Sequence, residues 1–347
     1  MAFRFRRSMK IAPGVRLNFS KSGVSTTLGA RGFTHTIGKR GQRTNIGLPG
    51  TGLSYSHRHK APTRSYTYAS PPEPRSKDPL KISLSGLLFK SKGEKAFIRA
   101  LQEFRNEDFK AAAAHLNAAT KSPDTAFLQG LCFFVDEDYD AAIEHFKAAL
   151  DGAETLGQVI EKYDQDISFR VNITDELRVR AGCDAIGIHF LLTEIHQAFE
   201  RFDQARKHAD ALLKIDSTRE EAIVSYADVV LSSENPTNDD LHRIVSLAAQ
   251  IENEDAVSTI VFIYRARALS MLGLQDAAID ILTQAARRKK DRPQHILNQV
   301  VYERALLLHD TGKKARAKKD LEKIYASDPT FADVAERLGI ASADEDA

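Results

Sequence analysis

Two stretches of the chain, NEDFKAAAAHLNAAT (residues 106–120) and DEDYDAAIEHFKAAL (residues 136–150), superimpose at a period of thirty residues. Each begins with a turn, continues with a small residue in a helical pattern, and places apolar residues four and seven positions later. The spacings of three and four between Tyr139, Ala142 and Phe146 form one apolar stripe on a helix. Repetition of one helical unit at such a period predicts a solenoid of paired helices.

The unit recurs later in the chain, at residues 200–213, 272–286 and 311–324. It resembles the tetratricopeptide repeat, a pair of antiparallel helices of about 34 residues. Gly273 and Gly312 occupy the turn position of that family. Small residues mark the points where the paired helices of the family pack closely: Ala100, Gly130, Ala266 and Ala305 in first helices, and Ala112, Ala142, Ala205, Ala278 and Ala317 in second helices. The resemblance covers roughly residues 93–339 and implies a solenoid that binds a protein or peptide in a groove lined by the first helices.

Two regions depart from the repeat. Residues 215–251 form a divergent repeat, with SSENPTND (232–239) as its turn, and residues 151–183 form an insertion. Within the insertion, DISFRVNIT (166–174) alternates apolar and polar residues as a strand does. The insertion is either a lip on one face of the solenoid or a long connection.

Candidate groove residues follow from the resemblance, which assigns them to the first helix of each pair; some of these positions serve the core instead. Related repeats that hold a C-terminal carboxylate have Lys and Asn in the first groove, where this chain has Phe97 and Leu101, so that specialised function is not expected. The candidates are Phe97, Leu101, Phe104, Phe127, Leu131, Phe134, Phe190, Glu194, Gln197, Ile263, Arg267, Ser270, Tyr302, Leu306 and His309.

The charge of the chain is divided unevenly. Residues 1–72 contain thirteen Lys and Arg residues and no Asp or Glu, whereas the remainder carries 36 basic and 47 acidic residues. A division this sharp indicates two units with different surfaces.

The basic end has the pattern of short strands. VRLNFS (15–20) alternates apolar and polar residues, and turn signals such as Pro13-Gly14 recur at short intervals, which predicts an antiparallel meander of about five or six strands with TGLSYS (51–56) as the last. Five of the eleven prolines then fall within residues 57–79. The expected fold class is therefore multidomain α+β. Its parts are a basic β-rich domain at 1–56, a Pro-rich linker at 57–92 and an α-solenoid at 93–347.

The stretch GLPGTGLS (47–54) has the glycine spacing of a phosphate-binding loop. Leu53 stands where that loop needs lysine, the flanking segments read as antiparallel strands, and HRHKAP rather than a helix follows. A tight turn is therefore predicted, and no nucleotide or other cofactor is expected.

Residues 2–56 also resemble a bacterial family known as domain of unknown function 4236, on FRFRRSMKIAPGVRLNFSKSGVSTTLG and GKRGQRTNIGLPGTGLSYS taken together. The resemblance implies a domain boundary and a bacterial origin but no activity. Unopposed cations suit a polyanion, and twelve of the thirteen lie in residues 1–60, which are therefore expected to meet nucleic acid, an anionic lipid surface or an acidic protein face. The aromatic residues there either stack on bases or build a small core, and the strand edges are alternatively open to self-association. The polyanion candidates are Arg4, Arg6, Arg7, Lys10, Lys39, Arg40 and Arg43.

Residues that carry chemistry are scattered. Cys132 and Cys183 lie far apart in helical contexts, which argues against zinc or a disulfide framework and for a reducing, cytoplasmic setting. His189 and His196, with Glu194 between them, are interpreted as partly exposed helix residues rather than as a metal or acid–base site. No arrangement of nucleophile and base is apparent, and no apolar run reaches the length of a membrane span. A non-enzymatic protein is predicted, with an uncharacterised enzyme as the alternative.

Overall fold

The computed structural model describes residues 6–12, 15–20, 23–28, 33–38, 41–47, 54–59, 90–163, 165, 167–174 and 176–340 of the 347-residue chain. Contacts divide the chain into two compact units. Unit 1 consists of Met1–Ser168, Gly182–Ile188 and Ala198–Glu200, and unit 2 of Phe169–Ala181, His189–Gln197 and Arg201–Ala347.

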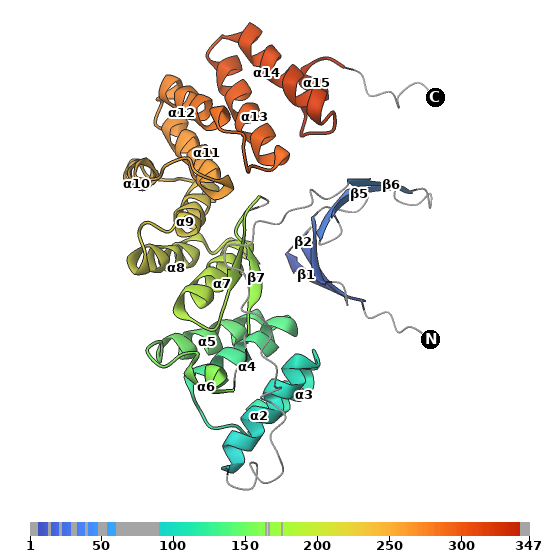
Figure 1. Ribbon diagram of the computed structural model, residues 1–347, viewed down its shortest axis with the longest axis vertical. Coiled ribbons are helices and arrows are strands. Elements are labelled where there is room, and N and C mark those ends of the chain that lie inside the picture. Colours follow the sequence, from blue (N-terminus) through green and yellow to red (C-terminus); the bar gives the residue numbers. More distant parts are fainter. Residues whose placement is uncertain are drawn as a thin grey trace. The chain divides into compact units, whose positions relative to one another are not determined.

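The predicted antiparallel meander is present in unit 1 as a six-stranded sheet in the order β1-β2-β3-β4-β5-β6 (Figure 1). The last strand spans Ser54–His59 rather than 51–56, because its pairing with β5 begins at Ser54, opposite Gly47. Residues 51–53 lie outside the described part of the chain. The strands are β1 Arg6–Ala12, β2 Val15–Ser20, β3 Gly23–Leu28, β4 Phe33–Gly38, β5 Gly41–Gly47 and β6 Ser54–His59.

The register of this sheet separates two kinds of residue. Successive residues of a strand alternate between the two faces of a sheet. Followed across all five pairings, one set of positions contains only polar residues and glycine, and five of its members are cations. The opposite set holds most of the apolar residues, including Leu17, Phe19, Phe33 and Tyr55. The five cations that share one face are Arg6, Lys10, Arg16, Arg43 and Arg58.

The glycine-rich stretch at 47–54 connects two antiparallel strands, since Gly47 of β5 pairs with Ser54 of β6. A phosphate-binding loop instead joins a strand to a helix, whose amide groups hold the phosphates. The prediction that antiparallel strands flank this stretch is therefore confirmed, and residues 48–53 themselves lie outside the described residues.

Helices of unit 1 begin at residues whose side chains cap them. Ser91, Asp108, Ser122 and Asp138 each accept a hydrogen bond from the backbone N–H three residues later, at 2.9 to 3.1 Å. These four caps start the two predicted helix pairs. The helices are α2 Lys92–Arg105, α3 Phe109–Leu116, α4 Pro123–Val135, α5 Tyr139–Leu150 and the short α6 Gln158–Lys162.

Close packing of α4 on α5 depends on Gly130. A Cβ atom added there would lie 2.7 Å from Cδ1 and Cε1 of Phe146, whose ring is fully buried. Ala142, at the small position predicted for the second helix, is also fully buried. The small residues therefore allow close approach of the two helices, as the repeat pattern predicts.

Unit 2 continues the same architecture. The small residues Ala205, Ala266, Ala278, Ala305 and Ala317 are all at most 2% exposed. The divergent repeat at 215–251 is present as the pair α9 and α10, with its turn between Ser232 and Asn238. The helices are α8 Phe202–Ile215, α9 Glu220–Ser232, α10 Asn238–Ala249, α11 Ala256–Met271, α12 Gln275–Arg287, α13 Gln294–Asp310, α14 Lys314–Ser327 and α15 Val334–Arg337, while α7 Ala185–Ala198 contributes residues to both units.

The turns between paired helices share one backbone conformation. Gly273 and Gly312 have φ values of 80° and 77°, in the left-handed region that glycine adopts without strain. Glu107, Glu137 and Glu200 occupy the same place in three other turns, with φ values of 61°, 68° and 58°. The turn geometry is thus kept where the sequence lacks the glycine.

The insertion contains α6 and a β-hairpin that belongs to unit 2. Its strands, β7 Phe169–Asn172 and β8 Arg178–Ala181, pair antiparallel, which confirms the strand predicted within residues 166–174. Val171 and Val179 face each other in the register and are both buried. The hairpin is therefore anchored by one apolar face.

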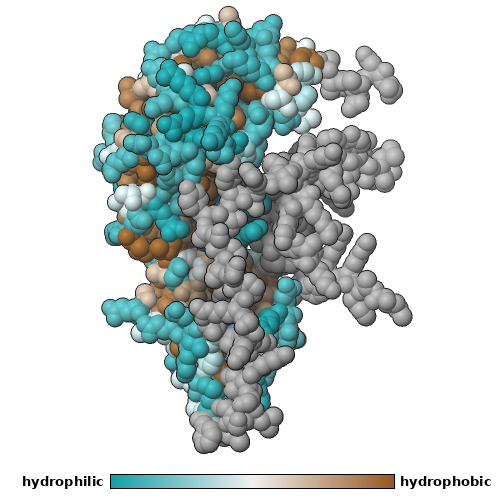
Figure 2. Space-filling model, in the orientation of Figure 1, coloured by the Kyte–Doolittle hydropathy of each residue, from teal (hydrophilic) through white to brown (hydrophobic). Residues whose placement is uncertain are grey.

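The surface of the described residues is mostly hydrophilic in the view of Figure 2, with hydrophobic residues in smaller patches. Within the part of the chain whose burial is described, five large hydrophobic residues are exposed, namely Phe199, Ile215, Met271, Leu274 and Ile340. Among the helices that the structure describes, none has both the length and the apolar character to cross a bilayer.

Candidate functional site

The fifteen predicted groove residues divide by exposure. Five of them, Phe97, Leu101, Phe127, Phe190 and Ile263, are at most 3% exposed and pack in the core, so they have no surface to offer a ligand. His309 is exposed. The nine half-buried candidates are Phe104, Leu131, Phe134, Glu194, Gln197, Arg267, Ser270, Tyr302 and Leu306.

A chain of polar contacts links the first helices of unit 2. Gln197 of α7 donates from Nε2 to Oδ2 of Asp228 on α9 at 2.6 Å, and the Tyr264 hydroxyl of α11 donates to Oδ1 of Asp228 at 2.5 Å. One turn further along α11, the guanidinium of Arg267 lies 4.9 Å from the centre of the Tyr264 ring and donates to Glu303 of α13 at 2.5 and 3.1 Å. Gln197, Asp228, Tyr264, Arg267 and Glu303 are called the polar ladder below.

Burial makes these contacts strong. It raises the pKa of Tyr264, and the nearby Asp228 carboxylate raises it further. Burial alone would lower the pKa of Arg267, but the charge and hydrogen bonds of Glu303 outweigh that effect and raise it. Both side chains therefore keep their protons at neutral pH, and the ladder holds its donors and acceptors in fixed contacts between the first helices.

Glu194 lies one turn before Gln197 on α7. Its Oε1 atom is buried and makes no hydrogen bond, and burial, followed by the negative charge of Asp228, raises its pKa well above the usual range. Burial therefore favours the protonated form of this carboxyl group. Among the predicted groove residues it is the one whose chemistry differs most from a solvated side chain.

Three histidines gather where α7 packs on α8. Nδ1 of His189 lies 3.1 Å from Nδ1 of His208, and the ring of His196 stacks on that of His208 with centroids 5.5 Å apart. Burial lowers the pKa of His189. The interpretation of His196 as a partly exposed residue is wrong, because it is only 4% exposed.

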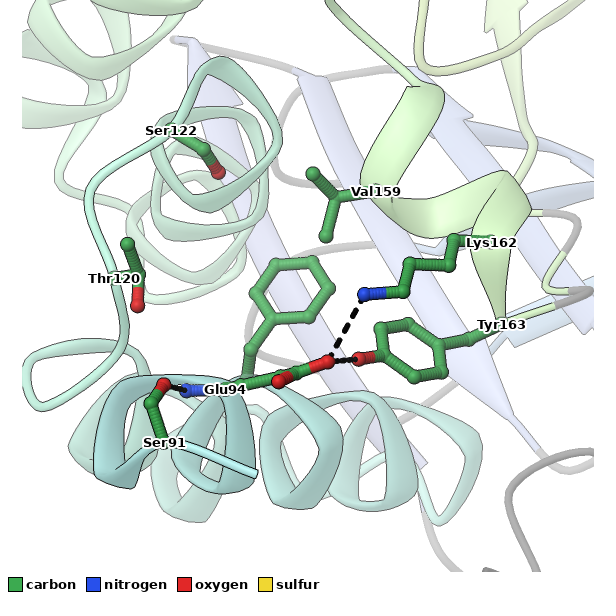
Figure 3. Close-up of a pocket in the computed structure, with 8 residues that line it drawn as sticks. Ser91, Glu94, Thr120, Ser122, Val159, Lys162 and Tyr163 are labelled. Atoms are coloured by element: carbon green, nitrogen blue, oxygen red, sulfur yellow. Dashed lines mark hydrogen bonds and ion pairs between the residues drawn. The ribbon is translucent and has the colours of Figure 1, made fainter. Parts of the chain in front are cut away.

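A pocket of about 240 Å³ lies in unit 1 between the start of α2, the α3–α4 turn and α6 (Figure 3). In it one oxygen of Glu94, Oε1, accepts hydrogen bonds from Lys90, Lys162 and Tyr163 at 2.6, 3.0 and 2.5 Å. These donors, with Lys90 the strongest, lower the pKa of Glu94 to about 2. The charged groups of the pocket therefore satisfy one another, and of the predicted residues only Phe97 lines it.

Among the described residues, no group of three or more His, Cys, Asp and Glu side chains could hold a metal ion. Both cysteines are free, and burial raises the pKa of Cys132 to about 12, which keeps its thiol protonated and unreactive. Cys183 is half-buried, and burial raises its pKa as well.

The predicted polyanion residues fall in three places. Arg4, Lys39 and Arg40 lie outside the described residues. Arg6, Lys10 and Arg43 occupy positions on the polar face of the sheet, whereas the position of Arg7 is on the opposite face.

Three ladder residues, Asp228, Tyr264 and Glu303, are not among the sequence candidates. The sequence candidates include no residue of α9, which belongs to the divergent repeat. Asp228 nevertheless stands out, because it is one of few polar residues in AIVSYADVV (222–230), where most neighbours are fully buried. A carboxylate on a buried helix needs a hydrogen-bond partner, and that requirement could have identified Asp228 from the sequence.

Comparison with known proteins identifies two regions of the chain. Residues 3–56 match the family profile described as protein of unknown function DUF4236, and residues 193–341 match that of the T7SS, ESX-1 secretion system protein EccA1, N-terminal domain. A search of curated protein sequences finds no significant match. The chain carries a DUF4236 region followed by a helical, tetratricopeptide-like solenoid.

Solved structures with similar helix arrangements are distant in sequence. The N-terminal domain of the EccA1 ATPase of Mycobacterium tuberculosis is 13% identical with a TM-score of 0.46, over 71% of this chain and 88% of that one. YrrB, described as a TPR protein with an unusual peptide-binding site, is 11% identical with a TM-score of 0.43, over 72% and 100%. A thermophilic TPR protein of Thermus thermophilus is 14% identical with a TM-score of 0.38, over 63% and 97%. At such scores, the assignment of the architecture rests on the helix pairs and buried small residues of this chain.

Proposed function

We propose that this protein is a non-enzymatic adaptor whose solenoid binds a segment of another protein along the ladder face of its first helices. The polar ladder is the observation that carries the proposal. Its contacts hold the half-buried Asp228 and Arg267 in fixed positions, so a ligand would meet an acceptor and a donor that need little ordering on binding. Leu306 and Ser270 on the same first helices are half-buried and add apolar and small contacts.

A pair of substitutions tests this function. Leu306→Glu places a charge on the first helix α13, whereas Leu274→Glu changes a 49%-exposed residue between α11 and α12. The full-length protein, used as bait in nuclease-treated extract of its host, is expected to retain its partner with Leu274→Glu and to lose it with Leu306→Glu. Equal retention by both folded variants would contradict binding at this face.

We propose as a second activity that residues 1–60 engage a polyanion, either a nucleic acid or an anionic surface, by charge alone. The register supports this activity, because Arg6, Lys10 and Arg43 share a polar face with two further cations while Phe19 and Phe33 belong to the opposite face. The positions of β1 and β6 at the two edges of the sheet support self-association as the alternative.

Salt dependence separates these alternatives. Affinity for a short oligonucleotide or for anionic vesicles is expected to fall roughly a thousandfold between 50 and 200 mM salt if about six phosphates are engaged. Replacement of Arg6, Lys10 and Arg43 by Gln should flatten that dependence. A mass in solution above that of the monomer that persists at both salt concentrations, without binding to either probe, would favour self-association instead.

A further inference from the structure

The pocket of unit 1 is built from three elements that are fixed to one another. A Cβ atom added to Gly93, in the first turn of α2, would lie 2.3 Å from the hydroxyl oxygen of Thr120, so glycine allows this turn to approach the α3–α4 connection closely. The fully buried Asp124 of α4 accepts hydrogen bonds from the backbone N–H groups of Gly157 and Ile160 at 2.6 and 2.8 Å. These contacts hold α6 at the start of α4, so the pocket has a defined shape.

Hydrogen bonds join the charged groups of the pocket, but their charges do not cancel. The ammonium groups of Lys90 and Lys162 donate to the same oxygen of Glu94, and this raises the pKa of both lysines, which therefore stay protonated at neutral pH. The pKa of Glu94 is about 2, so its carboxylate stays ionised. Asp124 is directed at α6 and does not line the pocket. Two positive charges thus face one negative charge, which leaves these three groups with one net positive charge.

The pocket also has hydrogen-bond donors to offer a ligand. The ammonium group of Lys162 has three N–H donors, of which Glu94 takes one, and its side chain is 60% exposed. The Ser91 oxygen accepts from the backbone N–H of Glu94, while its hydroxyl proton has no acceptor in the described part of the chain. Two helices, α2 and α4, begin at the pocket with Ser91 and Ser122 as their caps, and the positive ends of their dipoles add to the attraction for an anion.

The lining of the pocket favours a small organic acid over inorganic phosphate. Lys162 extends toward Glu94 in Figure 3, and Val159 lies near it with the hydroxyl groups of Ser122 and Thr120. The half-buried Val159 offers an apolar contact that phosphate cannot use, and a phosphate group carries up to about two negative charges. A monocarboxylate matches the single net charge, and a volume of about 240 Å³ leaves room for an apolar body.

We propose that this pocket binds a small monocarboxylate, with the carboxylate on Lys162 and Ser91 and the apolar body against Val159. The insertion at 151–183 then supplies one wall of a binding site through α6. Lysine suits this role, because its ammonium group is a compact point charge on a flexible stem. The inference goes beyond the adaptor function and does not depend on it, since the pocket belongs to unit 1 and the polar ladder to unit 2.

Titration of the full-length protein with phenylacetate, followed by the methyl NMR resonances of Val159, tests the proposal. A saturable shift with a dissociation constant of about 1 mM is expected, which is a modest affinity for a ligand of about ten non-hydrogen atoms. Phenylacetamide has the same shape without the charge and should bind at least tenfold more weakly. Inorganic phosphate, compared at constant ionic strength, is expected to compete at least tenfold less well than phenylacetate.

Variants separate the charge of the pocket from its space. Lys162→Gln removes the net positive charge and should weaken phenylacetate binding at least fivefold, whereas Lys162→Arg keeps the charge and should lose less. Val159→Phe fills the pocket while every charge remains, and it should abolish binding. The matched control is Lys147→Gln, which changes a lysine that also pairs with a glutamate, Glu144, but on α5 outside the pocket; its affinity should stay within twofold of the parent.

Several results would overturn the inference. These are the absence of a saturable shift at Val159, equal affinity for the acid and the amide, and competition by phosphate as strong as that of phenylacetate. Unchanged affinity in folded Lys162→Gln, or equal weakening by Lys147→Gln, would do the same, because the pocket lysine would then have no specific role. A melting temperature within a few degrees of the parent is the check that each variant is folded.

Discussion

Gly130 should be unable to accept even a methyl group while Phe146 is present. In Gly130→Ala, the new Cβ would lie 2.7 Å from two ring carbons of Phe146, against 3.4–4 Å for ordinary contact. Alanine improves helix propensity by about 1 kcal/mol, whereas overpacking a close contact costs about 1 to 3 kcal/mol. The substitution is therefore expected to lower the free energy of unfolding by about 1 kcal/mol.

The effect of Gly130→Ala on the free energy of unfolding should change sign once the ring of Phe146 is removed. Phe146→Leu shortens the side chain and costs about 1 to 2 kcal/mol by itself, because the ring is fully buried. In that background a methyl group added at position 130 has room, so Gly130→Ala should raise stability by about 1 kcal/mol. The coupling energy between the two substitutions is then about 2 kcal/mol.

Hydrogen exchange of the amides in α4 and α5 is the suitable measurement, since a repeat protein opens locally and need not unfold as one unit. Ala148→Gly, at an exposed position of α5, calibrates the helix-propensity contribution without a packing change. Additive effects of the two substitutions, within about 0.5 kcal/mol, would show that Gly130 and Phe146 are not in contact and that the pairing of α4 with α5 is misjudged.

Three further perturbations test other parts of the molecule. Gly312→Ala should lower stability in urea titrations by about 1 kcal/mol through its φ of 77° alone, since no atom lies within 4 Å of the new Cβ. Glu137→Ala should cost little, because a residue with a Cβ already adopts that conformation there. Equal costs for the two substitutions would contradict the turn geometry. Burial lowers the pKa of His189, so the unfolded chain binds more protons than the folded one below about pH 6.5, and stability present above that pH should be lost as the pH falls. The melting temperature of His189→Gln should therefore fall less than that of the parent between pH 7.5 and 5.5. An identical fall in melting temperature for both proteins would show that His189 does not cause the loss of stability. Limited proteolysis is expected to cut first between residues 56 and 92 and to leave a helical fragment, and a stable product that spans this region would argue against a linker there.

The repeat architecture could be predicted from the sequence because the packing leaves a local signature. Small residues recur wherever two helices approach closely, and Ala112, Ala142, Ala205, Ala278 and Ala317 are all nearly or fully buried as expected. The strand of the insertion could be predicted for a similar reason, since Val171 and Ile173 alternate with polar residues. Such patterns concern neighbours on one helix or strand, which the sequence places directly.

The site was predicted only in part, because it depends on contacts between repeats. Gln197 and Arg267 were identified from their positions in the family pattern. Their partners Asp228 and Glu303 were not, because they lie 31 and 36 residues further along the chain. The sequence also did not distinguish core residues from partly exposed residues among the candidates. Phe127 and Leu131 are one helical turn apart, yet only Leu131 is partly exposed. Nothing in the local pattern distinguishes those two cases.

The polar ladder should also determine how unit 2 responds to a stretching force. Asp228 ties α9 to both α7 and α11, and Arg267 ties α11 to α13, so neighbouring repeats of unit 2 are joined by discrete bonds in addition to apolar packing. Under tension along the repeats, apolar packing yields gradually as surfaces slide, but a hydrogen bond breaks over a fraction of an ångström and water can then replace it. Unit 2 should therefore stretch in steps under force, with each step the loss of one tie, and it should recover its length when the force is removed as long as the helix pairs themselves stay folded.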